Sequence, residues 1–338
     1  MVLETNFIYF MKKQFDMVTF GGATQDIMYY TKEAIIIKNK KNILAPELLA
    51  FEYGGKINSD DVHMTFGGGG MNTAVSFSNL ELKTSIFTNL GDDWFSDAIM
   101  KELKNKKIDI SNITKSQKIH AGFSFIINFG NYNEHILFTH RGANSLLNIS
   151  KQKLSNINSK WFYIASLGGK QNLFTKNINT IFEVAKNKNI KIAWNPGVPQ
   201  LNLGYKFFKK YFKNIEIFCL NKSEAIDLVK SSGIKTDNAE KLLKTMCSWG
   251  LKTCVITYGH LGAYVYDGKN IYFEKATKQK SINTTGAGDA FNSSFVAGLI
   301  IYNNDIKKSL KLAMLRSGGV VSNIGAQSGL LTKNHIKL

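Results

Sequence analysis

Cysteine is scarce in this chain, and no apolar run approaches the roughly 20 residues that a helix needs to cross a bilayer. The three cysteines, Cys219, Cys247 and Cys254, lack CxxC spacing, which argues against structural zinc and a disulfide framework. The apolar patch at residues 7–10 is too short for the core of a secretory signal. We therefore expect a cytoplasmic protein that does not bind membranes, with buried thiols at Cys219 and Cys254 and an N-terminal extension over residues 1–14.

Acidic residues are also few, since 25 Asp and Glu face 43 Lys and Arg and leave a formal net charge of +18. Such a charge invites a nucleic-acid interpretation. The lysines are scattered along the whole chain together with Asn, however, and no nucleic-acid-binding motif is present. The prediction is that nucleic acid is not a partner, while the positive field attracts phosphorylated substrates such as ATP.

Two familiar nucleotide-binding signatures are missing. No GxxxxGK[ST] motif occurs, which excludes a P-loop, and the glycine cluster at residues 67–70 fails the GxGxxG pattern because Thr73 stands in the last position. The glycines, among them Gly68 and Gly69, still allow a polar ligand to approach the backbone before an apolar helix expected over residues 74–82. Asn72 can recognise a hydroxyl through its donor and acceptor, or it can cap that helix.

The stretch from Asn283 to Phe291 carries the strongest chemical signal. Gly286, Ala287 and Gly288 precede apolar residues at helical spacing, so a loop should open a helix there. The unpaired N–H groups and the dipole of a helix start favour phosphate. The carboxylate of Asp289 would repel a phosphate bound at this helix start, so its presence there suggests a specific role. It either accepts a proton from a hydroxyl that attacks phosphate, or it caps the helix.

The order of predicted elements indicates an α/β protein with a separate small sheet. The first strand is expected at residues 15–20. Strands without intervening helices follow between residues 27 and 66, and the segments 119–129 and 134–140 form a hairpin that can extend the same small sheet. The strands expected between residues 27 and 66 cover 33–38, 48–53 and 62–66.

From residue 161 onward strands and helices alternate, which predicts a parallel sheet covered by helices. The strands are expected at 161–165, 191–194, 215–220 and 253–257, and the helices at 176–187 and 238–249. Ligands of such sheets bind beyond the carboxyl ends of the strands. The residues expected at those ends are Asp26, Ser166, Asn195, Asn221, Gly259 and the loop 283–289.

Two further sites have open interpretations. Asn221 and Glu224 lie one helical turn apart at a helix start, where Glu224 either holds Mg²⁺ through water or satisfies backbone donors as a cap. Arg141 is one of few arginines in a Lys-rich chain and either contacts substrate or lies on the surface.

Together these motifs resemble the ribokinase-like (PfkB) family of carbohydrate and nucleoside kinases, over about residues 15–327. The run 284–289 is similar to the family's most specific signature, the run 67–72 to its earlier glycine signature, and the run 221–224 to its Asn-x-x-Glu element. The three occur in the family's order. The resemblance implies a three-layer α/β/α fold with a mostly parallel central sheet and a small β-sheet lid formed by about residues 27–66 and 119–140, all within a kinase domain at 15–338.

The resemblance also implies the roles of individual residues. Asp289 is expected to be the catalytic base, with Gly286, Ala287 and Gly288 as an anion hole. The substrate-binding set is Asp26, Gly68, Gly69, Asn72 and Arg141. The ATP-binding set is Asn195, Asn221, Glu224, Thr257 and Gly259, with Glu224 also facing Mg²⁺ through water. One departure is Asn283, where the family usually has an Asp that in some members helps to bind potassium, so the resemblance leaves monovalent-cation activation open.

We therefore predict an enzyme that uses ATP and Mg²⁺ to phosphorylate a hydroxyl of a small sugar or sugar-like alcohol. A nucleoside kinase of the same family is the alternative, with Phe51, Tyr53 and Phe66 of the lid as candidate walls for a base. A catalytically silent sugar-binding protein is a third interpretation, against which the intact run 286–289 argues. An exposed edge of the lid sheet could pair two subunits into a homodimer.

Overall fold

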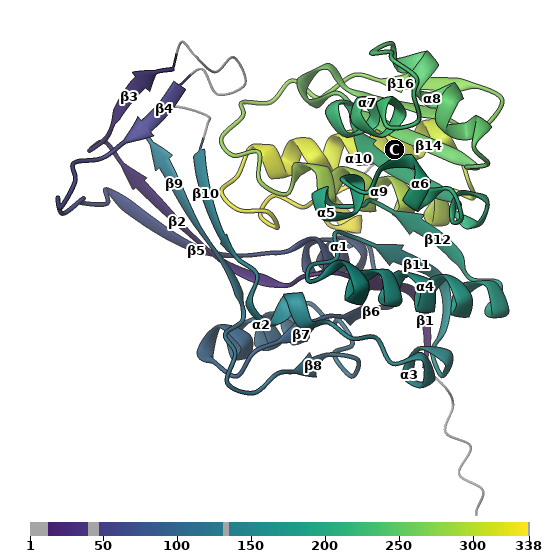
Figure 1. Ribbon diagram of the computed structural model, residues 1–338, viewed down its shortest axis with the longest axis horizontal. Coiled ribbons are helices and arrows are strands. Elements are labelled where there is room, and N and C mark those ends of the chain that lie inside the picture. Colours follow the sequence, from purple (N-terminus) through teal and green to yellow (C-terminus); the bar gives the residue numbers. More distant parts are fainter. Residues whose placement is uncertain (1–12, 40–46, 131–134, 337–338) are drawn as a thin grey trace, which may run out of the picture.

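An eight-stranded sheet forms the centre of the protein (Figure 1). The computed structural model describes residues 13–39, 47–130 and 135–336, so most of the predicted extension lies outside the described residues. In spatial order the strands are β16 (Ile271–Glu274), β15 (Ala263–Tyr266), β14 (Thr253–Thr257), β13 (Ile217–Asn221), β12 (Lys191–Trp194), β11 (Asn158–Ile164), β1 (Gln14–Phe20) and β6 (Thr84–Phe87). Every pair from β6 to β14 is parallel, and only β15 and β16 join antiparallel.

Helices cover both faces of this sheet because successive strand residues point to opposite sides. In β11, Phe162 packs into a core with α4, α7 and α8, while Tyr163 packs into a second core with α9 and α10. The α-helices are α1 (Gly69–Ser78), α2 (Trp94–Asn105), α3 (Lys151–Ser155), α4 (Gln171–Lys188), α5 (Val198–Leu201), α6 (Gly204–Phe208), α7 (Lys222–Lys230), α8 (Ala239–Ser248), α9 (Ala287–Ile301) and α10 (Ile306–Val321). The 3₁₀ helices are η1 (Gly142–Leu146), η2 (Phe212–Asn214), η3 (Gly259–Leu261) and η4 (Lys333–His335). Within the described ranges, no helix has both the length and the apolar character of a membrane span.

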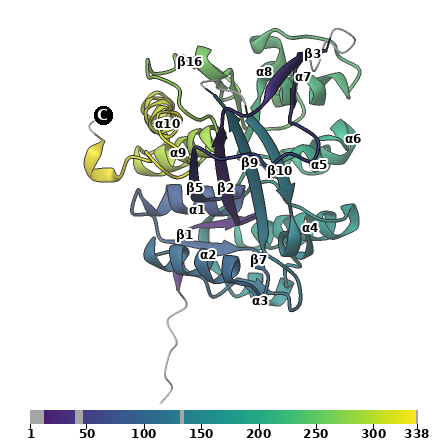
Figure 2. The same cartoon turned by 90° about the vertical axis from the view of Figure 1, so that its left-hand side faces the viewer.

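A second sheet projects from this body and carries a two-stranded extension at its far end (Figures 1 and 2). Its strands, in spatial order, are β10 (His135–His140), β9 (Gly122–Phe129), β2 (Thr24–Thr31) and β5 (Asp61–Gly67). The extension pairs β3 (Ile35–Lys38) with β4 (Glu47–Ala50), and a further small pair joins β7 (Asn89–Leu90) to β8 (Thr114–Lys115). The predicted hairpin and the strand predicted at 62–66 thus share one small sheet, although residues 131–134 of the turn lie outside the described residues. The strands predicted at 33–38 and 48–53 instead pair with each other, as β3 and β4, in the separate extension.

The α/β/α prediction is confirmed, and the strands predicted at 191–194 and 253–257 have those bounds. The other predicted strands shift by a few residues, and α4 begins five residues before the predicted start at 176. The bounds of one further helix are wrong. The helix expected at 74–82 begins at Gly69 and ends at Ser78, so the glycines form its first turn. Tertiary packing overrides their low helix propensity, because a Cβ on Gly70 would lie 2.6 Å from the carbonyl carbon of Gly21.

The thiols of Cys219 and Cys254 are buried, as predicted, and all three cysteines are free. Burial raises the pKa of the Cys219 thiol far above its usual range. The Sγ atom of Cys247 lies 3.0 Å from that of Cys254, where the end of α8 meets β14. The buried thiols of Cys219 and Cys254 therefore behave as small apolar side chains of the core.

Candidate active site

The loop before α9 is shaped by glycine and by a buried amide. Gly286 is the N-cap of α9 with a φ of 78°, in the left-handed region that favours glycine. A Cβ there would also lie 2.4 Å from the Cβ of Ala326. The side chain of Asn283 is buried, and its Oδ1 accepts a 2.8 Å hydrogen bond from the Thr285 backbone N–H. The loop therefore turns sharply into the helix and leaves the first N–H groups of α9 without helical partners.

Space for a ligand borders this helix start. A Cβ on Gly288 would meet no atom within 4 Å among the described residues. The Oγ1 atom of Thr285 is buried and has no hydrogen-bond partner in the described part of the chain. An open backbone position, an unpaired hydroxyl and a helix N-terminus together fit a phosphoryl group.

Asp289 points at α1 rather than at its own helix start. Its half-buried carboxylate accepts a 2.9 Å hydrogen bond from Asn72 Nδ2, and no side-chain cap closes α9. The interpretation of Asp289 as a helix cap is therefore wrong. Burial raises the pKa of the Asp289 carboxyl above its usual range, and the hydrogen bond from Asn72 opposes that rise. Asp289 is thus a carboxylate with raised proton affinity beside the open start of α9.

Asn72 lies inside α1, so the interpretation of Asn72 as an N-cap is wrong as well. The N-cap is Gly68, which has a φ of 87°. The Oδ1 atom of Asn72 accepts a 3.0 Å hydrogen bond from Gln327 Nε2 while its Nδ2 donates to Asp289. A Cβ on Gly69 would lie 3.6 Å from Asp289 Oδ1, so glycine keeps the surroundings of the carboxylate clear. The structure therefore brings Gly69, Asn72 and Asp289 together.

Asp26 lies in β2 of the small sheet and is almost fully buried, with 4% of its surface exposed. Thr24 Oγ1 donates a 3.1 Å hydrogen bond to its Oδ1, and a Cβ on Gly67 would collide with its Oδ2 at 2.1 Å. Burial raises the pKa of Asp26, and hydrogen bonds from Ser124 and Thr24 oppose the rise. Asp26 therefore borders the glycine run that leads into Gly68 and Asn72.

The residues predicted to bind ATP line the carboxyl ends of neighbouring strands. Asn195 follows β12 and donates a 2.9 Å hydrogen bond to the Cys219 carbonyl of β13. Asn221 and Thr257 are directly paired at the ends of β13 and β14. Gly259 follows two residues later with a φ of 55°, and a Cβ there would meet no described atom within 4 Å. These positions share one edge of the sheet and are open at Gly259.

Asn221 and Glu224 form a capping box at the start of α7, so the capping interpretation is confirmed. Asn221 Oδ1 accepts from the Glu224 N–H at 2.9 Å, and Glu224 Oε2 accepts from the Asn221 N–H at 2.8 Å. Burial raises the pKa of the half-buried Glu224, and the backbone hydrogen bond opposes the rise. Among the described residues, no three His, Cys, Asp or Glu side chains gather as a direct metal site.

Arg141 is exposed, and its side chain lies over Gly168, whose Cβ would be 3.6 Å from Arg141 Cδ. It borders the loop after β11, on the same side of the molecule as the turn between β1 and β2. That turn is held by Asn144, whose Oδ1 and Nδ2 bond the backbone N–H and carbonyl of Ala23 at 3.1 and 2.8 Å.

Sequence reasoning missed Gln327 and Asn144 as site residues. Gln327 follows α10 in a Gly-Ala-Gln turn, and a polar residue after such a turn was the available signal. The aromatic candidates for a nucleobase wall lie apart. Tyr53 is fully exposed, Phe51 borders a hollow of about 260 Å³ on the small sheet, and Phe66 packs against the core beside α1 and α2.

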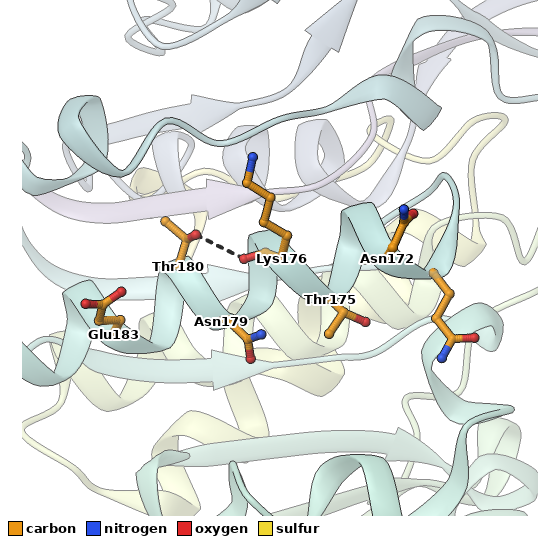
Figure 3. A pocket seen from close by; sticks show the side chains of 7 residues that line it. Asn172, Thr175, Lys176, Asn179, Thr180 and Glu183 are labelled. Atoms are coloured by element: carbon orange, nitrogen blue, oxygen red, sulfur yellow. Dashed lines mark hydrogen bonds between the residues drawn. The ribbon is translucent and has the colours of Figure 1, made fainter.

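A separate hollow of about 630 Å³ runs along α4, and Figure 3 shows that one helix supplies its labelled side chains. It contains none of the predicted site residues. Its polar lining includes Lys176, Asn179 and Glu183, and the drawn hydrogen bond joins Thr180 to the Lys176 carbonyl at 3.0 Å. A shallow face on one helix brings no groups together from different elements, so it does not compete with the site at α9.

An open helix start, a carboxylate of raised pKa beside it and a parallel sheet with polar residues at its strand ends are features that a phosphotransferase of the α/β class requires. Residues 40–333 match the pfkB family of carbohydrate kinases. The chain therefore belongs to the pfkB family, and it is a kinase that transfers phosphate from ATP to a hydroxyl group.

Similar proteins cover nearly the whole chain. A ribokinase of Staphylococcus aureus (strain COL) is 28% identical over 285 residues, which span 82% of this chain and 89% of that protein. The nucleoside kinase of Methanocaldococcus jannaschii has a similar fold, with a TM-score of 0.75 and 19% identity over 94% of this chain and 96% of its own. Arabidopsis thaliana ribokinase, complexed with ribose and ATP, gives a TM-score of 0.74 at 16% identity over 95% and 97% of the two chains.

Proposed function

We propose that this kinase phosphorylates a hydroxyl of a small sugar or sugar-like alcohol, with Asp289 as the catalytic base. This proposal rests on the hydrogen bond between Asn72 and Asp289, which lies beside the open backbone at Gly288. One group there can accept a proton, and the neighbouring backbone can hold the phosphoryl group.

In the proposed reaction the substrate hydroxyl oxygen attacks the γ-phosphorus of ATP. The new O–P bond forms as the bond from that phosphorus to the β–γ bridging oxygen breaks, ADP leaves, and the hydroxyl proton passes to Asp289. The backbone at Gly286, Ala287 and Gly288 would form the anion hole that stabilises the charge on the transferring group. Asn72 keeps the carboxylate oriented and lowers its proton affinity, so that it remains ionised when the hydroxyl arrives.

The small sheet supports a sugar as the acceptor. Its polar side chains Asp26 and Ser124 share one face, because they are directly paired, and both are buried. Thr65 belongs to the same face and lies against Gly325, two residues before Gln327. Hydroxyl-binding groups thus approach the site, whereas the aromatic side chains point elsewhere. We propose that residues 27–66 and 119–140 close over the sugar as a lid and exclude water.

The test is ATP consumption by the purified chain with Mg²⁺ and a panel of acceptors, with Asp289→Asn as the control. The panel holds ribose, fructose, fructose phosphates, 2-keto-3-deoxygluconate, adenosine, guanosine and inosine. Turnover with a sugar supports the proposal. Turnover only with a nucleoside would assign the acceptor class of the M. jannaschii relative, and ligand binding without ATP consumption would indicate a silent binding protein.

We propose that ATP binds at the carboxyl ends of the central strands. The residues that would contact it are Asn195, Asn221, Glu224, Thr257 and Gly259. Mg²⁺ supplies charge neutralisation between the phosphates when it is bound, and Glu224 would face it through water. The neutral side chain at Asn283 adds no charge for a monovalent cation, so a potassium titration of activity has to decide whether potassium activates the enzyme. Arg141 would face the substrate from the rim.

Glu224→Gln should raise the Mg²⁺ concentration for half-maximal activity about tenfold or more, because the amide lacks the charge that attracts the hydrated cation. Gln still offers an oxygen to the Asn221 N–H, so the capping box and the melting temperature should be retained. A Mg²⁺ titration of activity decides the matter. An unchanged titration with unchanged stability would leave Glu224 with a capping role alone.

We also propose that two copies pair through an apolar lid face, which we define as Ile27, Tyr29, Val62, Met64, Phe125 and Phe138. Strand pairing places these side chains on one side of the small sheet. Val62, Met64 and Phe138 are exposed to 44%, 60% and 58%. The neighbouring hollow of about 260 Å³, bordered by Tyr29 and Phe125, could accept an apolar side chain of a second copy. A twofold pairing would cover both faces at once.

Phe138→Lys should convert the dimer into a monomer, because it places a charge in the covered face. Leu137→Lys is the matched control, since Leu137 is 52% exposed on the same strand but points to the opposite face. Mass determination by light scattering measures both variants and the parent chain. A monomeric parent chain, or a Phe138→Lys variant that remains dimeric, would refute pairing through this face.

We further propose that the reaction takes place in the cytoplasm, and that neither nucleic acid nor a membrane is a partner. We further propose residues 15–338 as one kinase domain that includes the lid.

A further inference from the structure

Arg316 is one of only two arginines among the 43 basic residues of the sequence, and it is fully buried in α10. Its Nη1 donates to Ser76 Oγ and to Ser294 Oγ, each at 2.8 Å. Its Nη2 donates to the Ser76 carbonyl at 3.1 Å, and its Nε donates to the Leu331 carbonyl at 2.9 Å. These partners are neutral, and in the described ranges no carboxylate forms an ion pair with it. Burial lowers the pKa of Arg316 to about 9.

The partners of Arg316 repeat the active-site contacts one helical turn away. Ser76 follows Asn72 by four residues on α1, Ser294 follows Asp289 by five on α9, and Leu331 follows Gln327 by four on the C-terminal segment. At the site itself Asn72 binds both Asp289 and Gln327. Hydrogen bonds therefore join α1, α9 and the C-terminal segment at two levels. Asn72 makes them at the site, and the Arg316 guanidinium makes them about 6 Å further along the helices.

A chain of hydroxyls links the guanidinium to the backbone of Asp289. Ser293 Oγ lies 2.7 Å from Ser76 Oγ and donates to the Asp289 carbonyl at 2.5 Å. Each hydroxyl has one hydrogen. Because Ser76 accepts from Arg316, its own hydrogen is free for Ser293, and the hydrogen of Ser293 is free for Asp289.

We propose that Arg316 is a positioning residue that fixes the register of α1 against α9, and thereby the contact between Asn72 and Asp289. This inference rests on the proposed role of Asp289 as the base. The planar fork of arginine reaches three elements at once, which the single ammonium of lysine cannot do. Nearly all other basic residues of the chain are lysines. The need to reach three elements at once explains why this buried position holds an arginine.

The acidic limb of the pH profile separates positioning from plain structural support. Among the described residues, the titratable groups that interact electrostatically with Asp289 include Tyr163 of β11, which in turn interacts with Cys219 of β13. Burial keeps both neutral at ordinary pH, since it raises their pKa values. The hydrogen bond from Asn72 is therefore the main influence that lowers the pKa of Asp289. If that contact loosens, the acidic limb must move to higher pH.

The experiment compares Arg316→Met, Arg316→Lys and Ser293→Ala in the full chain, using the acceptor that supports turnover. We expect kcat to fall about tenfold to a hundredfold in the two Arg316 variants, the KM for ATP to stay near its original value, and the acidic limb to move upward. Lysine should fail to rescue the arginine. Ser293→Ala keeps the guanidinium and its Ser76 and Ser294 contacts, so it folds even if Arg316→Met does not, and it should shift the limb in the same direction.

Met246→Ala, which removes a buried side chain from α8 on the opposite face of the sheet, is the control for lost stability alone. It should lower the melting temperature and leave the acidic limb in place. Arg316 and Ser293 variants with an unshifted limb would overturn the positioning role while Asp289→Asn remains inactive. An active Asp289→Asn would instead overturn the base assignment, and with it the inference.

Discussion

Replacing Asp289 with Asn should lower kcat by about 10²–10⁴-fold, the contribution typical of a positioned general base. The amide has nearly the shape of the carboxylate and can still contact Asn72, but it cannot accept the hydroxyl proton. ATP should still bind, because the backbone groups of α9 and the strand ends are untouched. Steady-state kinetics and nucleotide titration measure the two effects separately. Normal turnover of the variant would remove Asp289 from the mechanism.

The raised pKa of Asp289 sets the pH dependence of both activity and stability. The base acts only when ionised, so kcat/KM should fall as pH drops through its folded-state pKa, above the ordinary value of 3.8. Folding disfavours the charged form. The parent chain should therefore lose stability relative to Asp289→Asn as pH rises from 3.8 through the raised pKa, and the difference should vanish at lower pH. Denaturant titrations at several pH values test the sign.

Local patterns in the sequence predicted most of the sheet. The strands at 191–194 and 253–257 are short, mostly apolar runs that are followed by turn residues. The local sequence therefore determines their bounds with little influence from tertiary contacts. The start of α1 was predicted wrongly because glycine has a low helix propensity, whereas the close approach of Gly70 to Gly21 leaves room only for glycine in this helix. That approach joins segments about 50 residues apart, which no local pattern contains.

The site was predicted as a set of residue types but not as contacts. Glycine clusters and strand ends indicated Asp289 and Asn72, yet their hydrogen bond spans 217 residues of sequence. Each was open to a local interpretation as a helix cap, and the structure removes both interpretations. Arg141 drew attention because arginine is rare, whereas Arg316 lies within an ordinary helical pattern. Only its burial with hydrogen bonds to two serines distinguishes it.

Gly288→Ala should lower kcat/KM by about 10²-fold and leave the protein as stable as before, or more stable by up to about 1 kcal/mol. The new Cβ meets no described atom within 4 Å, and alanine favours the helix more than glycine does. The methyl group instead occupies the open space in which the phosphoryl group has to approach the backbone N–H groups. Kinetics and thermal unfolding on the same preparation measure both effects.

Gly286→Ala is the matched substitution two residues earlier, and it should fail for a different reason. Its Cβ would lie 2.4 Å from the Cβ of Ala326, and its φ of 78° is strained for alanine, so folding should lose about 2 kcal/mol or more. Activity should fall as well, because the loop that aims the N–H groups moves. The two variants then differ in stability although both lose activity. Gly286 is required by the fold, whereas Gly288 is required by the ligand. If Gly288→Ala were fully active, the phosphoryl group could not bind against this backbone, and the anion seat would have to lie elsewhere.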